Sequence, residues 1–389
     1  MPVKNRFAEL LPEITAWRRD FHEHPELLFD VHRTAGRVEE LLKSFGCDEV
    51  VTGLGRTGVV GVIRGRTNTS GRTIGLRADM DALPIHEATG LDYASKTPGK
   101  MHACGHDGHT AMLLGAAKYL AETRNFDGTA VVIFQPAEEG GGGGRVMVED
   151  GLIDRFAIDE VYGMHNMPGI PVGSFAIRPG AMMAAADQFT ITITGKGGHA
   201  AKPHDCIDPI LIASQIVVSF QSVVARNLDP LKNGVISVCT FRPESESHNV
   251  IPQTVVLRGT CRSLAPEVRD LLEARVTEIA TGTAAMMGGR ADVVYERGYP
   301  VTMNDPQATE WAAAVADQVS GGQVDLTMQP LMGGEDFSYM LNERPGAYIF
   351  VGNGDTAHVH HPAYNFDDAA IPFGSSWYVG MVEDRLKAA

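Results

Sequence analysis

The sequence predicts an α/β protein that carries an inserted ferredoxin-like α+β domain. Between residues 73 and 135 a strand, a loop, a helix and a second strand follow one another, which is the alternation typical of an α/β domain. Near residue 184 the pattern changes, and polar and apolar residues alternate from Gln188 to Thr194. The expected elements then follow the order βαββαβ, which is the ferredoxin-like arrangement.

The α/β part is expected to begin with two helices within residues 12–45, separated by a break at Pro25. The apolar segments that follow predict three strands, a helix and a buried strand at residues 50–51, 58–63, 73–78, 107–123 and 128–135. After the insertion, a helix and a strand are predicted at residues 307–319 and 347–351. This domain is therefore expected to comprise residues 1–185 and 298–389.

The inserted domain is expected to span residues 186–297, a common length for a small domain. After its first strand, the sequence predicts a helix, two strands, a second helix and a last strand at residues 209–227, 235–241, 254–262, 266–287 and 291–296. The first of these helices is long and amphipathic.

Charge and composition argue against several classes of partner. The 389 residues include 33 Lys and Arg against 48 Asp and Glu, which gives a formal net charge of −15 at pH 7. Because nucleic acids and anionic membranes attract clusters of Lys and Arg, neither is expected as a partner. No stretch approaches the roughly 20 apolar residues that span a bilayer, so a cytoplasmic protein is expected. The five cysteines are an odd number and do not resemble a disulfide framework.

The densest group of potential metal ligands lies at residues 101–109, which read MHACGHDGH. Cys104 and His106 lie two residues apart among glycines, beside further histidines and a carboxylate. A thiolate together with imidazoles suits a transition metal better than calcium or magnesium. Alone, such a pair is as often structural as functional, but within this cluster we interpret it as a metal site.

Two adjacent carboxylates, Glu138 and Glu139, follow an apolar strand. A solvated acidic turn is the alternative, but charge without a partner at the end of a buried strand is unfavourable. We therefore favour a functional pair in which one carboxylate binds metal and the other transfers protons. The glycine run at residues 140–144 lacks the Lys-Ser/Thr of a phosphate-binding loop, so we attribute it to close backbone packing or to loop mobility.

Two further histidine positions are candidates for ligation. His165 directly follows a short apolar strand, where a lone histidine is more often a core residue. His360 belongs to a group of three histidines within residues 358–361, near another strand end. The spacing alone leaves open which of the three binds metal.

Taken in order, these motifs resemble those of the N-acyl amino acid amidohydrolases, the group of hippurate hydrolases, bacterial aminoacylases and plant auxin-conjugate hydrolases. The matches extend from His24 to Asp367 and include residues 77–85, 102–109, 135–140, 163–165, 195–200, 249–252 and 334–337. The resemblance implies a zinc-peptidase-like catalytic domain with a mixed central sheet, and a small domain for dimerisation and closure over the site. It also implies a homodimer or a dimer of dimers.

The resemblance further implies two divalent transition metal ions, held by five ligands: Cys104, His106, Glu139, His165 and His360. Glu138 would be the general base, and Asp81 would support a ligand without binding metal itself. His199 would stabilise the developing oxyanion, from its own chain or from the partner subunit. Asn249 and Arg262 match positions that hold substrate, although an ordinary strand role is an equal alternative for Arg262. Zinc, manganese, cobalt and nickel all stay open, since a thiolate tolerates them to different degrees.

The implied reaction is hydrolysis of an N-acyl amino acid, of the hippurate or N-acetyl type, to a carboxylic acid and a free amino acid. Glu138 would take a proton from an activated water and pass it to the departing amine. One alternative is a metallo-dipeptidase or carboxypeptidase on the same fold, whose pocket would recognise a free amine. Another is a non-catalytic metal-binding protein.

Overall fold

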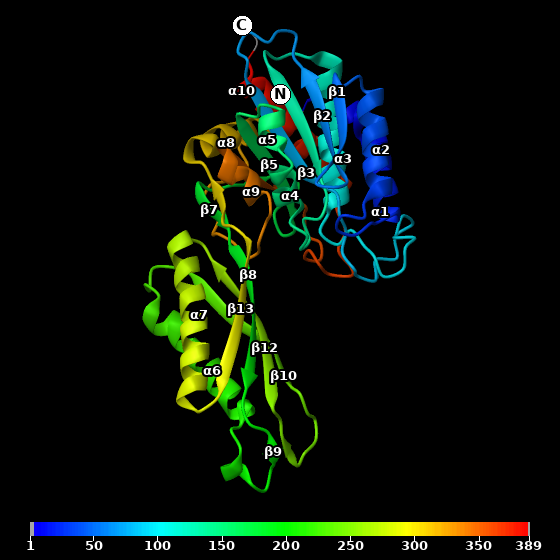
Figure 1. Ribbon diagram of the computed structural model, residues 1–389. Helices are drawn as coiled ribbons and strands as arrows, with labels where there is room; N and C mark the ends of the chain where they lie inside the picture. The colour runs from blue at the N-terminus through cyan, green and yellow to red at the C-terminus, as the bar shows by residue number, and fades with distance from the viewer. Residues whose placement is uncertain (1–3, 388–389) are drawn as a thin grey trace. The chain divides into compact units, whose positions relative to one another are not determined.

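The computed structural model describes residues 4–387, which group into two compact units (Figure 1). The first unit runs through Met182 and takes up Met303–Gln329 and the chain from Asp336 onward. The second comprises Met183–Thr302 and Pro330–Glu335. The predicted limits of the inserted domain, 186 and 297, fall within this second unit. The segment Pro330–Glu335, which the sequence assigns to the other domain, groups with it as well.

An eight-stranded mixed sheet forms the centre of the first unit, in the order β1-β2-β4-β3-β5-β16-β6-β15. Its four middle strands run parallel: β4 (Thr129–Gln135), β3 (Thr73–Asp79), β5 (Glu160–Met167) and β16 (Gly346–Gly352). The outer strands are β1 (Glu49–Leu54), β2 (Gly58–Arg64), β6 (Phe175–Ala176) and β15 (Val324–Asp325). The middle strands are almost wholly buried, which explains their continuous apolar sequence. The predicted mixed α/β sheet is confirmed.

Helices pack around this sheet and against one another. The long ones are α1 (Arg6–Glu23), α2 (His32–Ser44), α3 (His106–Thr123), α8 (Pro306–Ser320) and α10 (Ile371–Arg385). Helix α1 begins at Arg6, earlier than the expected residue 12, because Phe7 and Leu10 continue the apolar stripe of Ile14. Helix α3 is buried along most of its length and contacts both α1 and α10.

The second unit has a four-stranded antiparallel sheet in the order β10-β12-β8-β13. These strands are β8 (Ala185–Thr194), β10 (Gly234–Pro243), β12 (Thr254–Ser263) and β13 (Arg290–Tyr299), and the helices are α6 (Pro209–Ser222) and α7 (Pro266–Met286). The order βαββαβ and this strand arrangement confirm the ferredoxin-like topology. Alternate residues of β8, such as Ile191 and Ile193, enter the core that both helices cover.

Helix α6 departs from two expectations. The predicted helix at 209–227 is interrupted at Ser222 and ends in a π-helical turn, Val223–Asn227. Contrary to the expectation of no such stretch, Pro209–Asn227 is long and apolar enough by composition to cross a membrane, with a mean hydropathy of 1.4. Its buried residues Ile212, Ile216 and Phe220 follow helical spacing and belong to the core, so the helix is amphipathic rather than uniformly buried.

The glycine run after Glu139 is explained by close backbone packing. A Cβ atom at Gly143 would lie 1.7 Å from the carbonyl oxygen of Pro136, and one at Gly144 would lie 2.7 Å from that of Asp336. Both distances are shorter than any side chain tolerates. The glycines therefore allow helix α4 (Gly143–Glu149) to start directly against the turn that carries the two glutamates.

Candidate metal centre

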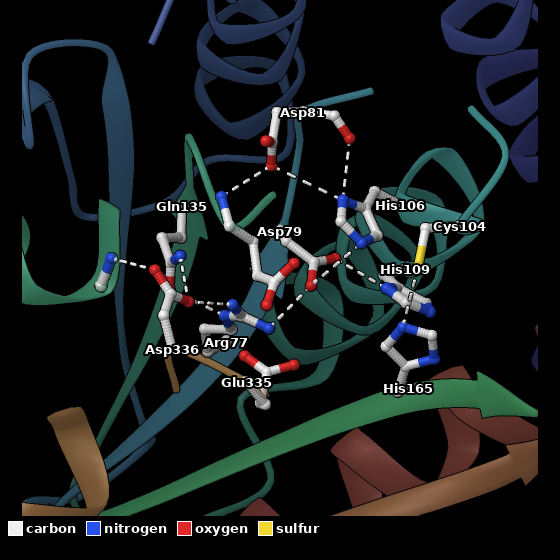
Figure 2. A network of polar contacts seen from close by, with 12 residues as sticks. Arg77, Asp79, Asp81, Cys104, His106, His109, Gln135, His165, Glu335 and Asp336 are labelled. Atoms are coloured by element: carbon white, nitrogen blue, oxygen red, sulfur yellow. Dashed lines mark hydrogen bonds and ion pairs between the residues drawn. The ribbon is translucent and has the colours of Figure 1, made fainter. Parts of the chain in front are cut away.

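The candidate ligands of the first unit meet at the carboxyl ends of its parallel strands. Strand β3 leads to Asp81, β4 to the two glutamates, and the loop after β16 to His360. His165 is an exception to the sequence prediction, because it lies inside β5 and not after it. Carboxyl ends of parallel strands are where α/β proteins place their sites, since loops from neighbouring strands converge there. Figure 2 shows part of the resulting cluster, with Asp81, Cys104, His106 and His165 labelled.

His106 is held from both sides by carboxylate-bearing residues. Its Nδ1 lies 2.8 Å from the carbonyl oxygen of Asp81 and donates to it, so Nδ1 carries a proton. Its Nε2 lies 3.7 Å from Asp79 and 3.9 Å from Glu139 and has no hydrogen-bond partner, although it is buried. Nε2 is therefore the ring nitrogen that could bind a metal ion once it has lost its proton.

Asp81 fixes the turn that carries the two glutamates. Its Oδ1 accepts the backbone N–H of Glu138 at 2.9 Å, and its Oδ2 accepts that of Glu139 at 3.1 Å. Ala137, just before them, has a φ of 55°, a conformation that is strained for a residue with a side chain. The buried carboxylate of Asp81 thus holds this turn in an unusual shape.

Cys104 and His165 face each other across the cluster. The Sγ of Cys104 lies 3.3 Å from Nε2 of His165, and both residues are buried. Nδ1 of His165 lies 2.5 Å from the carbonyl oxygen of Asn166, so this nitrogen carries the proton of the neutral ring. The lone pair on Nε2 consequently points at the thiol, as in a shared metal site.

His360 reaches the cluster through Glu139, since its Nε2 lies 3.3 Å from Oε1 of that carboxylate. Its backbone N–H donates to the carbonyl oxygen of Ala103 at 2.7 Å, and its φ is 67°. A histidine held in this left-handed conformation points to a functional constraint on its placement. Among residues 358–361, His360 is the histidine that joins a candidate ligand group in the described structure.

The described residues fit a metal ion by their chemistry. Their ligand atoms form overlapping groups within 4.8 Å of one another: Cys104, His106 and His165; Cys104, Glu139 and His360; and His106, Glu138 and Glu139. The buried atoms Nε2 of His106 and Oε1 of Glu139 have no hydrogen-bond partner, which is unfavourable unless a cation satisfies them. Imidazole, thiolate and carboxylate together suit divalent transition metals.

The protonation of the cluster depends on its burial and charge. Burial by itself would lower the pKa of His106, but the surrounding carboxylates, that of Asp79 first, raise it to about 10. Burial, together with the charges of Glu139 and Glu138, raises the pKa of the Cys104 thiol well above its usual value. Burial and the neighbouring His109 keep the pKa of His165 well below its ordinary value, so that ring is neutral.

Metal affinity is therefore expected to rise with pH. In the metal-free protein His106 and Cys104 hold protons at neutral pH because both pKa values are raised, and a cation must displace these protons to bind. Each proton released makes binding about tenfold tighter per pH unit. Calorimetric titration with zinc from pH 6 to 8, in buffers of different protonation enthalpy, measures the affinity at each pH and the number of protons released. An affinity that does not change with pH would contradict this account.

The remaining predicted site residues lie in the second unit. His199 is exposed in the short strand β9 (Gly198–His199), which pairs with β11 (Val250–Ile251) and so lies next to Asn249. The backbone N–H of Ala201 donates to Nδ1 of His199 at 3.1 Å, which leaves Nε2 as the donor of the neutral ring. Arg262 lies half-buried on β12 and donates to the carbonyl oxygen of Cys261 at 3.1 Å.

Several buried residues at the centre were not assigned a role from sequence. Asp79 and His109 form a hydrogen bond of 2.6 Å, and Asn166 and Tyr364 form one of 2.7 Å beside Cys104. The spacing of His106 and His109 on one helical face, next to two aspartates, could have indicated the first pair. No local signal marks Asn166 or Tyr364, which are distant in sequence.

Comparison with known proteins places the chain in a family. The model of peptidase family M20/M25/M40 matches residues 75–384. The chain is 41% identical to the hippurate hydrolase of Campylobacter jejuni, over 97% of this chain and 98% of that one. It is 42% identical to the N-acetyl-L-cysteine deacetylase of Bacillus subtilis, with 94% and 86% covered. It is also 40% identical to thermostable carboxypeptidase 2 of Saccharolobus solfataricus, with 90% and 88% covered.

The solved structures agree with these relatives. The chain superimposes with a TM-score of 0.85 on a dinuclear metal binding peptidase of the M20 family from Bacillus subtilis, at 34% identity and with 98% and 100% of the two chains covered. The fold is therefore one that supports two divalent metal ions, and the predicted family resemblance is confirmed. The chain belongs to peptidase family M20/M25/M40 and is a hydrolase of amide C–N bonds.

Proposed function

We propose that the protein is a metal-dependent amidohydrolase that cleaves N-acyl amino acids to a carboxylic acid and a free amino acid. The observation that carries the proposal is the pair Glu138 and Glu139, fixed by Asp81 beside buried imidazoles and a buried thiol. Adjacent carboxylates in a fixed turn can divide metal binding and proton transfer between them. Hippurate and N-acetyl-L-cysteine, the substrates named for two relatives, are both N-acyl amino acids.

Five side chains are proposed to hold the two ions: Cys104, His106, Glu139, His165 and His360. When bound, the ions would lower the pKa of a water molecule and polarise the amide carbonyl. Glu138 is the proposed general base and acid, taking a proton from the water and returning it to the departing amine. It is only 7% exposed, so the proton stays within the site between the two steps. Zinc, manganese, cobalt or nickel could serve.

His199, Asn249 and Arg262 are proposed to act on the substrate from the second unit. A neutral His199 with its proton on Nε2 would donate to the developing oxyanion, in its own chain or in the partner's site. The hydroxyl of Ser247 donates to Oδ1 of Asn249 at 2.8 Å, so the amide nitrogen is the group of Asn249 proposed to donate to the substrate. Arg262 would pair with the carboxylate of the amino acid.

The test is release of free amino acid from benzoyl-glycine and a panel of acetyl amino acids. Protein stripped with a chelator is re-supplied with zinc, manganese, cobalt or nickel in turn. Release that disappears on stripping and returns with metal would support the proposal and would identify the acyl group, the amino acid and the metal. Release that persists after complete stripping would refute metal dependence.

A metallo-dipeptidase or carboxypeptidase is the second candidate, and the carboxypeptidase among the relatives favours it. It would hydrolyse unblocked dipeptides or blocked peptides faster than acyl amino acids in the same metal-restored assay. A non-catalytic metal-binding protein would bind two ions and turn over none of these substrates. The substrate panel therefore separates all three functions.

The domain of residues 186–297 is proposed to mediate a homodimer, or a dimer of dimers, and to act as a lid on the domain of residues 1–185 and 298–389. Helix α6 and its extension expose four apolar side chains, namely the adjacent Ile210 and Leu211, then Val218 about two turns further on, and Val224. An exposed apolar stripe of this kind is typical of a protein interface.

A cytoplasmic location is proposed as well. All five cysteines are free, which suits the reducing cytoplasm.

Light scattering is accordingly expected to give at least twice the chain mass of 41.8 kDa. Leu211→Glu, at a residue 58% exposed on α6, should shift the protein toward the monomer because it places a charge in the interface. Leu326→Glu, at a residue 55% exposed in the first unit, is the matched control and should leave the mass unchanged. Equal masses for both variants would argue against an interface on α6.

A further inference from the structure

A continuous series of buried polar contacts runs next to Cys104 and His165, and Figure 2 shows its members Arg77, Asp79 and His109. Arg77 donates to Oδ2 of Asp79 at 2.8 Å, and Oδ1 of Asp79 lies 2.6 Å from Nδ1 of His109. Nε2 of His109 in turn lies 2.9 Å from the backbone nitrogen of Asn166 and 3.0 Å from its Nδ2. Arg77, Asp79, His109 and Asn166 are each 0% exposed.

The contacts of His109 determine which ring nitrogen carries its proton. A backbone N–H can only donate, so Nε2 of His109 must accept from Asn166. In the neutral ring the proton then lies on Nδ1, which donates it to the carboxylate of Asp79. His109 thus faces Asn166 as an acceptor and Asp79 as a donor, and it presents no lone pair to a metal ion.

Every polar atom of Asn166 is used by this arrangement. Its Nδ2 carries two hydrogens, which are shared between Nε2 of His109 and the carbonyl oxygen of Cys104 at 2.7 Å. Its Oδ1 accepts from the hydroxyl of Tyr364 at 2.7 Å, and its carbonyl oxygen accepts from Nδ1 of His165. The side-chain amide of Asn166 therefore fixes the backbone at Cys104, and the backbone carbonyl of the same residue holds the ring of His165.

The packing leaves this amide no second position. A Cβ atom at Gly105 would lie 2.4 Å from Nδ2 of Asn166 and 2.4 Å from the hydroxyl oxygen of Tyr364, so the loop backbone lies directly against both groups. Reversing the amide would aim Oδ1 at the carbonyl oxygen of Cys104 and at the acceptor nitrogen of His109, which is electrostatically unfavourable. Tyr364 on one side and His109 on the other therefore select one orientation.

We propose that His109 is a positioning residue that, with Tyr364, orients Asn166 and through it sets the thiol of Cys104 and the ring of His165 for metal binding. The inference rests on the proposed metal site but not on any substrate. Outer hydrogen-bond partners of metal ligands typically change metal affinity by about 10- to 100-fold. Because this series of hydrogen bonds ends at the carbonyl oxygen of Cys104, losing the His109 contact should change the bond between the Cys104 sulfur and the metal.

Two substitutions of His109 separate its two contacts. The amide nitrogen of Asn can replace Nδ1 of a histidine, so His109→Asn keeps the donor to Asp79 and loses the acceptor for Asn166. The amide oxygen of Gln can replace Nε2, so His109→Gln keeps the acceptor for Asn166. If His109 had only a structural role, His109→Asn would impair folding at least as much as metal binding. If His109 acts through Asn166, the two variants should differ in metal binding and not in folding.

The experiment uses the full-length protein with cobalt(II) as the probe. Cobalt affinity is measured by competition with a chelator, and Cys104 ligation by the near-ultraviolet absorption that a thiolate gives with cobalt. For His109→Asn we expect affinity to fall about 10- to 100-fold, with a weakened or shifted thiolate band. For His109→Gln we expect the cobalt affinity and the thiolate band to stay near those of the unaltered protein. Circular dichroism and the melting temperature of the metal-free protein show whether each variant is folded.

Three outcomes would overturn the inference: equal cobalt binding by the Asn and Gln variants, an unchanged band in His109→Asn, or no thiolate band in the unaltered protein. Should His109→Asn fail to fold, Tyr364→Phe removes only the hydroxyl on the other side of Asn166. It should weaken binding and shift the band in the same direction, and no change would refute the proposal. Since no substrate is used, the cobalt result would still hold if the protein did not hydrolyse acyl amino acids. Failure of this proposal can therefore be told apart from failure of the proposed function.

Discussion

Replacing Glu138 with glutamine is expected to lower kcat on the best acyl amino acid by about 10² to 10⁴-fold, the usual contribution of a positioned acid and base. Glutamine keeps the shape of the side chain, and the backbone N–H at this position still donates to Asp81. The variant cannot accept the proton of the attacking water or return it to the amine. Steady-state kinetics and metal analysis of the same preparation measure the effect.

The neighbouring Glu139→Gln is the matched control, since it makes the same change one residue later in the same turn. Glu139 lies 3.3 Å from His360 and has a buried oxygen without a hydrogen-bond partner, so its loss should reduce metal content. Glu138→Gln should retain both ions and lose turnover. If Glu138→Gln lost metal instead, that residue would belong among the ligands; if it kept full activity, it would not be the base.

Replacing Arg77 with methionine is expected to destabilise the first unit by about 3–5 kcal/mol, the range for breaking a buried ion pair. Arg77 is 0% exposed and donates to Asp79 at 2.8 Å and to Asp336 at 2.9 Å. Removing the guanidinium takes away the buried positive charge to which both carboxylates are hydrogen-bonded. Calorimetry of the metal-free protein should show a melting temperature lowered on the order of 10 °C.

Arg33→Met provides the control for this change. Arg33 pairs with Asp20 at 2.7 Å, but both side chains are more than a third exposed, and such surface pairs contribute about 0–1 kcal/mol. The same substitution at an exposed site should therefore shift melting by only a few degrees. Equal shifts for the two variants would mean that the Arg77 network does not stabilise the sheet end as argued.

Most elements of the fold could be predicted because their sequences repeat at the period of their structure. The strand alternation at residues 188–194, the amphipathic helix expected at 209–227 and the helix expected at 266–287 predicted the ferredoxin-like order that the sheet confirms. Prediction was weaker where burial removes periodicity. The sequence placed His165 after a strand, but the residue lies within β5. That strand is buried on both faces, and a continuously apolar run does not mark where a strand ends.

The candidate site was predicted in part for a comparable reason. Cys104, His106 and the two glutamates lie in short motifs, so their donor chemistry is visible from local sequence. The choice of His360 among three histidines needed either a family resemblance or the structure, because spacing does not show which ring points inward. Whether the residues of the second unit, such as His199, act on this centre stays a prediction.

The sequence by itself determined the fold class from its periodicity and the family from the resemblance of its motifs. It also indicated the types of the candidate ligands, since periodicity and donor types are local properties of the chain. Only the tertiary structure decided that Asp81 clamps the glutamate turn and that His109 and Tyr364 orient Asn166. These contacts join residues far apart in sequence, and hydrogen bonding depends on distance and direction, which no local pattern encodes. The protonation of His106 likewise follows from carboxylates that folding brings around it.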